Sequence, residues 1–96
     1  MSASIVFNKA LYLLDKGDPR AEAELLRAIS LADTEHDEFT LVGSLCAFGD
    51  FLCSLSRFEE ALPFLERVII AAENREDMFG FELKRAKDLL ALHKKI

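Results

Sequence analysis

The chain has 96 residues, enough for one domain with a modest hydrophobic core. Hydrophobic residues make up 51% of it, which excludes a disordered chain, and its four Gly and two Pro favour a few long helices over many short strands. Residues 1–80 carry seven Lys and Arg against fifteen Asp and Glu (−8), whereas residues 81–96 carry five against two (+3). This acidic body disfavours nucleic acid as a partner and favours a basic protein, although a surface that only keeps the chain soluble is the alternative.

No apolar run approaches the ~20 residues that span a bilayer, and residues 1–9 lack the basic start and apolar centre of a signal peptide. We therefore expect a cytoplasmic protein that contacts no membrane. Cys46 and Cys53 fall in one predicted helix, about 10.5 Å apart along its axis, which is too far for a disulfide. Because there is no C-x-x-C pair and no His cluster, we expect reduced thiols, no metal and no cofactor.

Two helices are expected in the first third of the chain. The first has an amphipathic stripe formed by Phe7, Ala10, Leu11 and Leu14. Gly17 then breaks the pattern, and Asp18 is placed to cap the next helix with Pro19 at its first position. The apolar side of the second helix consists of Ala21, Leu25, Ala28, Ile29 and Ala32.

The third helix has the most regular pattern in the chain. Thr34 and Asp37 have the spacing of a capping box at its start, and Ser56 and Glu59 have the same spacing at the start of the fourth helix. Between them, apolar residues repeat at intervals of four and three: Leu41, Leu45, Phe48, Leu52 and Leu55.

The fourth helix is expected over residues 57–73, with Pro63 inside it, where the ring removes one backbone hydrogen bond. Its apolar stripe is Phe58, Ala61, Leu65, Val68 and Ile69. Asn74 and Asp77 begin a last helix whose main apolar face is Phe79, Leu83, Ala86 and Leu90. A second apolar side, Leu89, Leu92 and Ile96, predicts either additional cover or a homodimer contact.

An internal repeat relates the two halves. The spacing of Ala21, Leu25 and Ala28 recurs forty residues later in Ala61, Leu65 and Val68, and an i, i+4, i+7 apolar set precedes each. The second copy, from Leu45 through Phe48-Gly49, Leu52, Phe58 and Ala61 to Leu65 and Val68, resembles the tetratricopeptide repeat family in its roughly 40-residue form, with Gly49 and Ala61 as the small residues of close helix approach.

This resemblance covers residues 41–72 best and residues 4–32 less closely, because Asn8 replaces a small residue. It implies an all-α, right-handed superhelix of about five helices in a single domain over residues 1–96. The expected parts are one hairpin at about 4–32, a second at about 35–73, and a capping helix at about 76–95.

Ligands of this family usually lie along the concave side, which the first helix of each repeat forms. Carried over by position, the resemblance implies a partner-binding set of Ile5, Lys9, Tyr12 and Leu13 in the first repeat and Gly43, Cys46, Asp50, Cys53 and Ser54 in the second. The two cysteines could equally fill space, and Asp50 could be a solvated carboxylate. The second copy offers nothing basic on this side, so we expect no clamp for a peptide carboxylate.

Catalysis is not expected. His36 and His93 have no nucleophile near them in sequence, and Glu59 and Glu60 sit in a helix first turn, where the backbone dipole favours negative charge. Three functions remain as hypotheses. The first is an adaptor or chaperone-like module that binds a peptide or partner protein. The second is a small acidic immunity protein or antitoxin that covers a basic toxin. The third is a structural subunit of a larger assembly.

Overall fold

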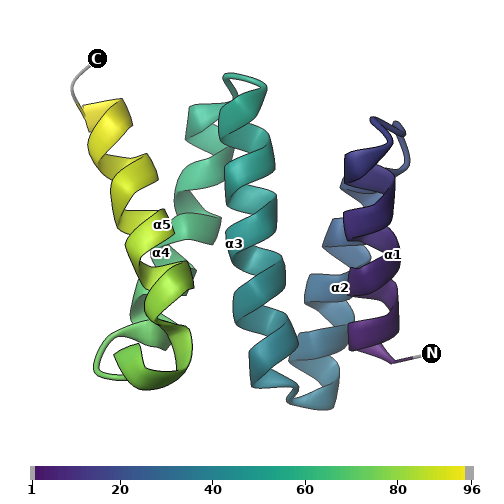
Figure 1. Ribbon diagram of the computed structural model, residues 1–96, viewed down its shortest axis with the longest axis horizontal. Coiled ribbons are helices and arrows are strands. Elements are labelled where there is room, and N and C mark those ends of the chain that lie inside the picture. Colours follow the sequence, from purple (N-terminus) through teal and green to yellow (C-terminus); the bar gives the residue numbers. More distant parts are fainter. Residues whose placement is uncertain (1, 95–96) are drawn as a thin grey trace. The chain divides into compact units, whose positions relative to one another are not determined.

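A computed structural model describes residues 2–94, and within them it contains five α-helices and no strand. The helices are α1 (Ala3–Asp15), α2 (Ala21–Glu35), α3 (Glu38–Ser54), α4 (Phe58–Ala72) and α5 (Glu76–Lys94), shown in Figure 1. The all-α class with about five helices is therefore confirmed. The superhelical arrangement of the repeat family stays a prediction.

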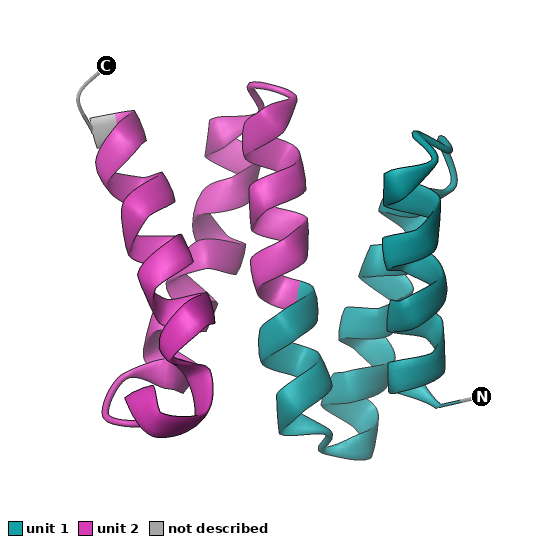
Figure 2. Ribbon diagram, in the orientation of Figure 1, with its two compact units in different colours: residues 1–44 teal, residues 45–96 magenta. Residues whose placement is uncertain are grey.

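The chain forms two compact units, residues 1–44 and 45–96, and the boundary between them falls inside α3 (Figure 2). The first unit contains α1, α2 and the start of α3. The second contains the rest of α3, α4 and α5. No helix in the described part of the chain is both long enough and apolar enough to cross a membrane.

In the first unit, α1 and α2 pack against each other. The buried side of α2 is the predicted one, Ala21, Leu25, Ala28, Ile29 and Ala32. The buried side of α1 differs from the prediction: it consists of Ala3, Val6, Ala10 and Leu13. Leu11 is 38% exposed, and Phe7 and Leu14 are only half-buried. The predicted stripe is thus rotated, because α1 carries apolar residues on nearly every side.

The helices α2 and α3 also begin later in the chain than expected. Gly17 has a φ of +66°, which glycine adopts at no steric cost, and α2 starts at Ala21 instead of Pro19. The predicted capping box at Thr34 is wrong, because Thr34 still belongs to α2 and its hydroxyl donates to the Ser30 carbonyl. Asp37 itself caps α3, since its carboxylate accepts hydrogen bonds from the Thr40 backbone N–H at 3.1 Å and from the Thr40 hydroxyl at 2.7 Å.

In the second unit, close packing of α3 on α4 depends on Gly49. A Cβ built there would lie 2.5 Å from Cδ2 of Leu65, a residue with no exposed surface, so the predicted role of Gly49 as a small contact residue is confirmed. The capping box predicted at Ser56 is wrong, because Ser56 has a φ of +61° and no side chain caps α4. Pro63 lies inside α4, as predicted.

The last helix packs against α4 and contains a kink. Phe79 has non-helical angles (φ −125°, ψ 28°), so the residues before it are out of phase with those after it. The buried side is Phe79, Leu83, Ala86 and Leu89. Leu89, expected on a second apolar side, is therefore a core residue, and Leu90 is half-buried.

Candidate protein-binding surfaces

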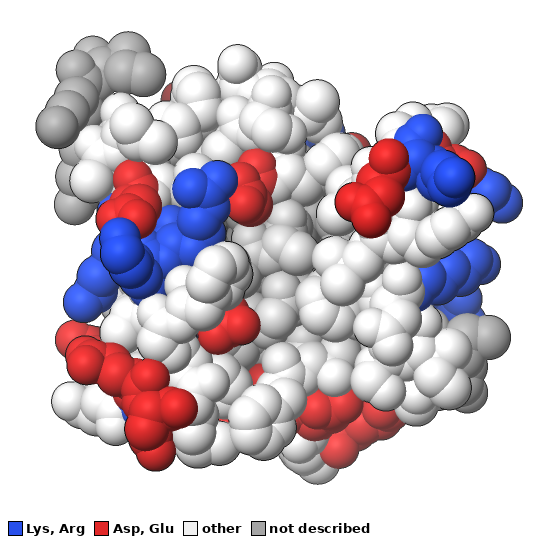
Figure 3. All heavy atoms as spheres, in the orientation of Figure 1, with Lys and Arg blue, Asp and Glu red and all other residues white. Residues whose placement is uncertain are grey.

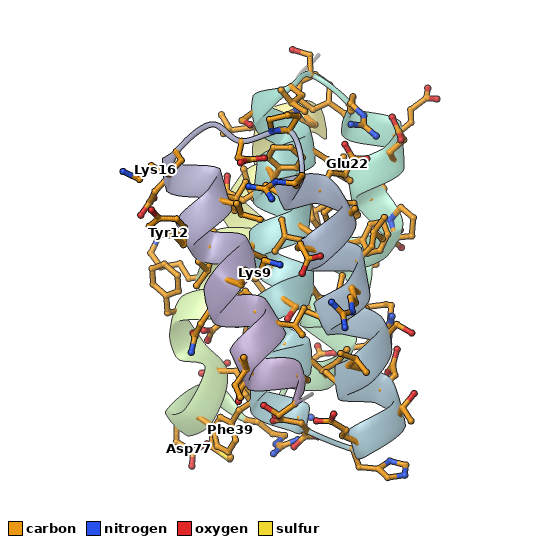
Figure 4. The ribbon with its side chains drawn as sticks, turned by 90° about the vertical axis from the view of Figure 1, so that its right-hand side faces the viewer. Lys9, Tyr12, Lys16, Glu22, Phe39 and Asp77 are labelled. Carbon is orange, nitrogen blue, oxygen red and sulfur yellow. The ribbon has the colours of Figure 1, made fainter. Side chains whose placement is uncertain are left out.

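The exposed side of α1 carries most of the predicted first-repeat set. Ile5 and Tyr12 stand seven residues apart, hence on the same side of the helix, and are 59% and 60% exposed. Lys9 lies between them, and its Nζ is 3.9 Å from Oε2 of Glu24 in α2. Lys16 continues this side, with its Nζ 5.5 Å from the centre of the Tyr12 ring. Figure 4 shows Lys9, Tyr12 and Lys16 all extending from α1.

Two further members of the predicted set do not lie on this surface. Leu13 is 4% exposed and belongs to the core. Gly43 lies in α3 beside Phe7, whose Cε2 would be 3.1 Å from a Cβ built at position 43. A larger side chain at position 43 would meet that ring. Gly43 therefore marks a close approach of helices inside the first unit.

The second-repeat set is in contact with α5. Arg85 binds Asp50 through two hydrogen bonds of 3.0 and 2.9 Å, which raise the pKa of the guanidinium further. Cys46 is buried, with its Sγ 3.9 Å from the carbonyl oxygen of Glu82. Burial, with smaller contributions from the charges of Glu82 and Asp50, raises the pKa of the Cys46 thiol to about 11.

Cys53 also meets α5. Its Sγ lies 3.2 Å from Nε2 of His93, whose ring is in turn 3.6 Å from the ring of Phe58, centre to centre. Burial, and then the negative charge of Asp50, raises the pKa of Cys53, so both thiols resist ionisation near neutral pH. Ser54 is exposed and donates to the Phe51 carbonyl at 2.6 Å. Three of the four predicted second-repeat residues in this unit, Cys46, Asp50 and Cys53, therefore contact α5.

A groove between α4 and α5 was not predicted from the sequence. It encloses about 440 Å³ and is lined by Leu62, Glu66, Ile69, Ile70 and Leu90. Two features of the sequence could have indicated this groove: Leu62 and Ile70 are large apolar residues that lie outside the predicted apolar stripe of α4. They are 37% and 76% exposed.

The residues predicted for a homodimer contact divide three ways. Leu89 is 4% exposed, Leu92 is 58% exposed, and Ile96 lies outside the described residues. The three therefore do not form one described surface.

Charge is distributed unevenly over the surface. Basic side chains gather over α5 on the face shown in Figure 3, with acidic side chains beside them. Part of this pattern is ion pairing, since Lys84 lies 2.9 Å from Asp88 within α5. In α4, Glu60 accepts two hydrogen bonds of 2.7 Å from Arg57, which lower its pKa. The Glu60 carboxylate is thus accounted for by a local ion pair.

Residues 2–94 contain no group of three or more His, Cys, Asp or Glu side chains placed to hold a metal ion. Comparison with family models, with curated proteins and with solved structures gives no match. A function for this chain must therefore be inferred from which of its side chains are exposed and which are covered.

Proposed function

We propose that this chain is a protein-binding module that holds a peptide or a partner protein against the exposed side of α1. The observation that carries the proposal is the pair Ile5 and Tyr12, two large side chains about 60% exposed on one side of one helix. An aromatic ring and an aliphatic side chain in this arrangement are typical of the anchor residues that dominate protein interfaces. Lys9 and Lys16 add positive charge to the same side and favour a partner segment that contains carboxylates.

The accessibility of α1 supports this choice over the second-repeat residues. Cys46, Asp50 and Cys53 each contact a residue of α5, whereas Ile5 and Tyr12 are open to solvent. A partner can reach the α1 residues without displacing a helix. We therefore assign the binding role to the α1 part of the set implied by the repeat resemblance.

The test is affinity capture from the native host followed by mass spectrometry, comparing wild type with Tyr12→Ala and with Ile5→Ala. We expect both variants to lose the same partner, with binding weakened about tenfold or more, because anchor residues cost more than about 1.4 kcal/mol when truncated. Leu26→Ala is the matched control, since Leu26 is 43% exposed but lies on α2. Equal capture by all four proteins would remove the α1 surface from consideration.

A second candidate function is an acidic inhibitor, such as an immunity protein or antitoxin, that covers a basic toxin. The observation that favours it is the charge of residues 1–44, which contain four Lys and Arg against eight Asp and Glu. Binding of this kind should weaken steeply as salt is added, because it rests on many charges, whereas binding anchored by Ile5 and Tyr12, with charge contributed by Lys9 and Lys16 alone, should weaken much less. An isothermal titration at low and high salt with the captured partner separates the two.

A further inference from the structure

The exposed side of α1 has the spacing of a helix-packing seam. Its four exposed residues follow one another at intervals of four, three and four: Ile5, Lys9, Tyr12 and Lys16. The Lys16 backbone N–H still donates to the Tyr12 carbonyl at 3.2 Å, so Lys16 stays in phase with the helix. This alternation is the one along which two helices pack in a coiled coil. These four residues, the α1 seam, extend over about three turns, or about 16.5 Å.

Apolar and basic side chains alternate along the α1 seam. Lys9 follows Ile5 by four residues, and Lys16 follows Tyr12 by four. Figure 4 shows Lys9, Tyr12 and Lys16 side by side on α1. A helix that packs along this seam must present apolar side chains to Ile5 and Tyr12. Carboxylates are the groups that complement the two lysines.

Both lysines are available to a partner. The Nζ of Lys9 is 3.9 Å from Oε2 of Glu24, and Nη1 of Arg27 is 3.8 Å from the same oxygen. Both distances exceed that of a hydrogen bond, and this buried oxygen accepts none from the described residues. Arg27 would remain beside Glu24 when Lys9 turned to a partner. Lys16 contacts the Tyr12 ring and makes no ion pair with a described residue.

An extended peptide fits this seam poorly. Ile5 and Tyr12 are seven residues apart, hence about 10.5 Å along the helix axis. About three residues of an extended chain span that distance, and side chains three apart on a strand point to opposite faces. On a helix, positions i and i+7 have the same rise and lie on the same side. Geometry therefore favours a helical partner.

We propose that the α1 seam binds an acidic amphipathic helix of a partner protein. Its apolar residues meet Ile5 and Tyr12, and its Asp or Glu side chains meet Lys9 and Lys16. This assignment rests on the proposed function of α1 and specifies the partner. The net charge of the whole chain favours a basic partner, but complementarity at a contact depends on the charges at that contact. A helix of about 12 residues is long enough to cover the seam.

The first experiment compares synthetic helical peptides of about three heptads. One carries Leu and Glu alternating along its seam, the second carries Lys in place of Glu, and a staple on the outer side keeps each helical. By fluorescence anisotropy, the Glu peptide should bind wild type at least about tenfold more tightly than the Lys peptide. Equal affinities, tighter binding of the Lys peptide or no binding of the Glu peptide overturns the proposal.

A third peptide tests the helical geometry. It has the Glu sequence without the staple and with a proline in its middle, which breaks the helix. It should bind about tenfold more weakly than the stapled Glu peptide. If it binds as tightly, the occupant of the α1 seam is an extended acidic segment and the proposed helix is wrong.

The second experiment locates the binding site on the protein. The double variant Lys9→Gln, Lys16→Gln should bind the Glu peptide about three- to tenfold more weakly than wild type. The matched control is Lys84→Gln, Lys87→Gln, which removes the same charge from α5 and should bind like wild type. Circular dichroism establishes that both variants are folded. If both weaken binding equally, net charge alone attracts the peptide and the assignment to the seam is wrong.

Failure of this assignment can be told apart from failure of the α1 function. A partner captured from the host that is lost in Tyr12→Ala but binds the Lys9→Gln, Lys16→Gln variant like wild type would use α1 without being an acidic helix. A partner that binds Tyr12→Ala and Ile5→Ala like wild type would show that α1 is not the binding surface at all. Loss of the partner in both Tyr12→Ala and the double lysine variant is the result expected here.

Discussion

Arg85 of α5 donates two hydrogen bonds to Asp50 of α3, from Nε to Oδ2 at 3.0 Å and from Nη2 to Oδ1 at 2.9 Å. The two side chains are each 41% exposed, so solvent reaches the pair from one side. A bidentate arrangement fixes direction as well as distance. This ion pair links α5 to the side of α3 that carries Cys46 and Cys53.

We predict a measurable coupling between Asp50 and Arg85. Asp50→Ala, Arg85→Ala and the double variant should give a coupling free energy of about 0.5–1 kcal/mol by urea unfolding, because the pair is bidentate but partly solvated. The corresponding cycle for Lys84 and Asp88, an exposed i, i+4 pair, should give about 0.3–0.5 kcal/mol. A smaller coupling for Asp50 and Arg85 than for that reference pair would contradict the prediction.

We predict that Gly49→Ala destabilises the protein. The added Cβ would lie 2.5 Å from Cδ2 and 2.9 Å from Cγ of Leu65, so either the leucine or the helix must move. Overpacking of this kind costs about 1–3 kcal/mol, and the better helix propensity of Ala returns up to about 1 kcal/mol. Chemical denaturation should therefore show a net loss.

Gly80→Ala is the matched substitution. Gly80 lies in α5, and a Cβ there meets no atom within 4 Å. The propensity gain should then act alone and raise the free energy of unfolding by up to about 1 kcal/mol. If both substitutions shift stability in the same direction, the packing argument for Gly49 fails.

We predict that Cys46 makes the protein less stable at alkaline pH. The pKa of its thiol is about 11 in the folded protein against an ordinary value of 9.0. Below pH 9 both states keep the proton. Between these two values the unfolded chain loses a proton that the folded chain retains, so the free energy of unfolding falls as pH rises. The loss attributable to this thiol should be on the order of 1 kcal/mol.

The measurement is urea unfolding of wild type and Cys46→Ala at about pH 8 and about pH 10.5. Lys and Tyr side chains titrate in both proteins and cancel in the comparison. The wild type should lose more stability than the variant over this interval. Parallel losses would show that the thiol does not titrate with the shifted pKa.

We predict that Arg20 holds the pKa of Asp18 low. The Arg20 guanidinium donates to both carboxylate oxygens at 3.0 and 2.8 Å, and the Arg20 backbone N–H donates at 2.8 Å. Together they lower the pKa of Asp18 from 3.8 to about 2, with the side chain as the larger cause. The associated stability is present above the unfolded value and is lost as pH falls from 3.8 toward 2.

In Arg20→Ala, the pKa of Asp18 should rise part of the way back toward 3.8, because the backbone hydrogen bond remains. Carboxyl ¹³C shifts followed against pH report this directly. Arg27→Ala serves as the control, since Arg27 lies 3.8 Å from Glu24 and does not contact Asp18. An unchanged Asp18 titration in Arg20→Ala would contradict the assignment.

The sequence predicted α2 and the α3–α4 packing well, for a physical reason. In α2, Ala and Leu alternate with Glu and Arg at helical spacing, so only one side can be buried. In α3, the sequence predicted that Gly49 allows α4 to approach closely, and the structure confirms this contact with Leu65. Where polar and apolar residues separate cleanly, the pattern fixes the phase of the helix.

The sequence predicted the buried side of α1 poorly and that of α5 in part. In α1, Val6 and Leu13 compete with Phe7 and Leu14 for the core, and spacing alone does not choose between them. In α5, Phe79, Leu83 and Ala86 are buried as predicted, but Leu89 is buried in place of Leu90, because both follow Ala86 at helical spacing and spacing alone does not choose between them.

The contacts of the candidate site could not be predicted from local patterns. Asp50 and Arg85 are 35 residues apart, and Cys53 and His93 are 40 apart. Their pairing depends on how α5 returns along α3, which tertiary packing decides. The exposure of Ile5 and Tyr12 could be predicted, because neither residue belonged to the apolar stripe predicted for α1.

The position of α5 has a thermodynamic consequence for any ligand of the α3 side that bears Cys46, Asp50 and Cys53. Such a ligand competes with α5, which belongs to the same chain and already contacts this side of α3. Only molecules in which α5 has moved away are competent, so the apparent dissociation constant equals the intrinsic one divided by that fraction. If about one molecule in a hundred is open, affinity falls about a hundredfold. With a coupling of about 0.5–1 kcal/mol, the pair of Arg85 and Asp50 would contribute a factor of about two to five to that loss of affinity.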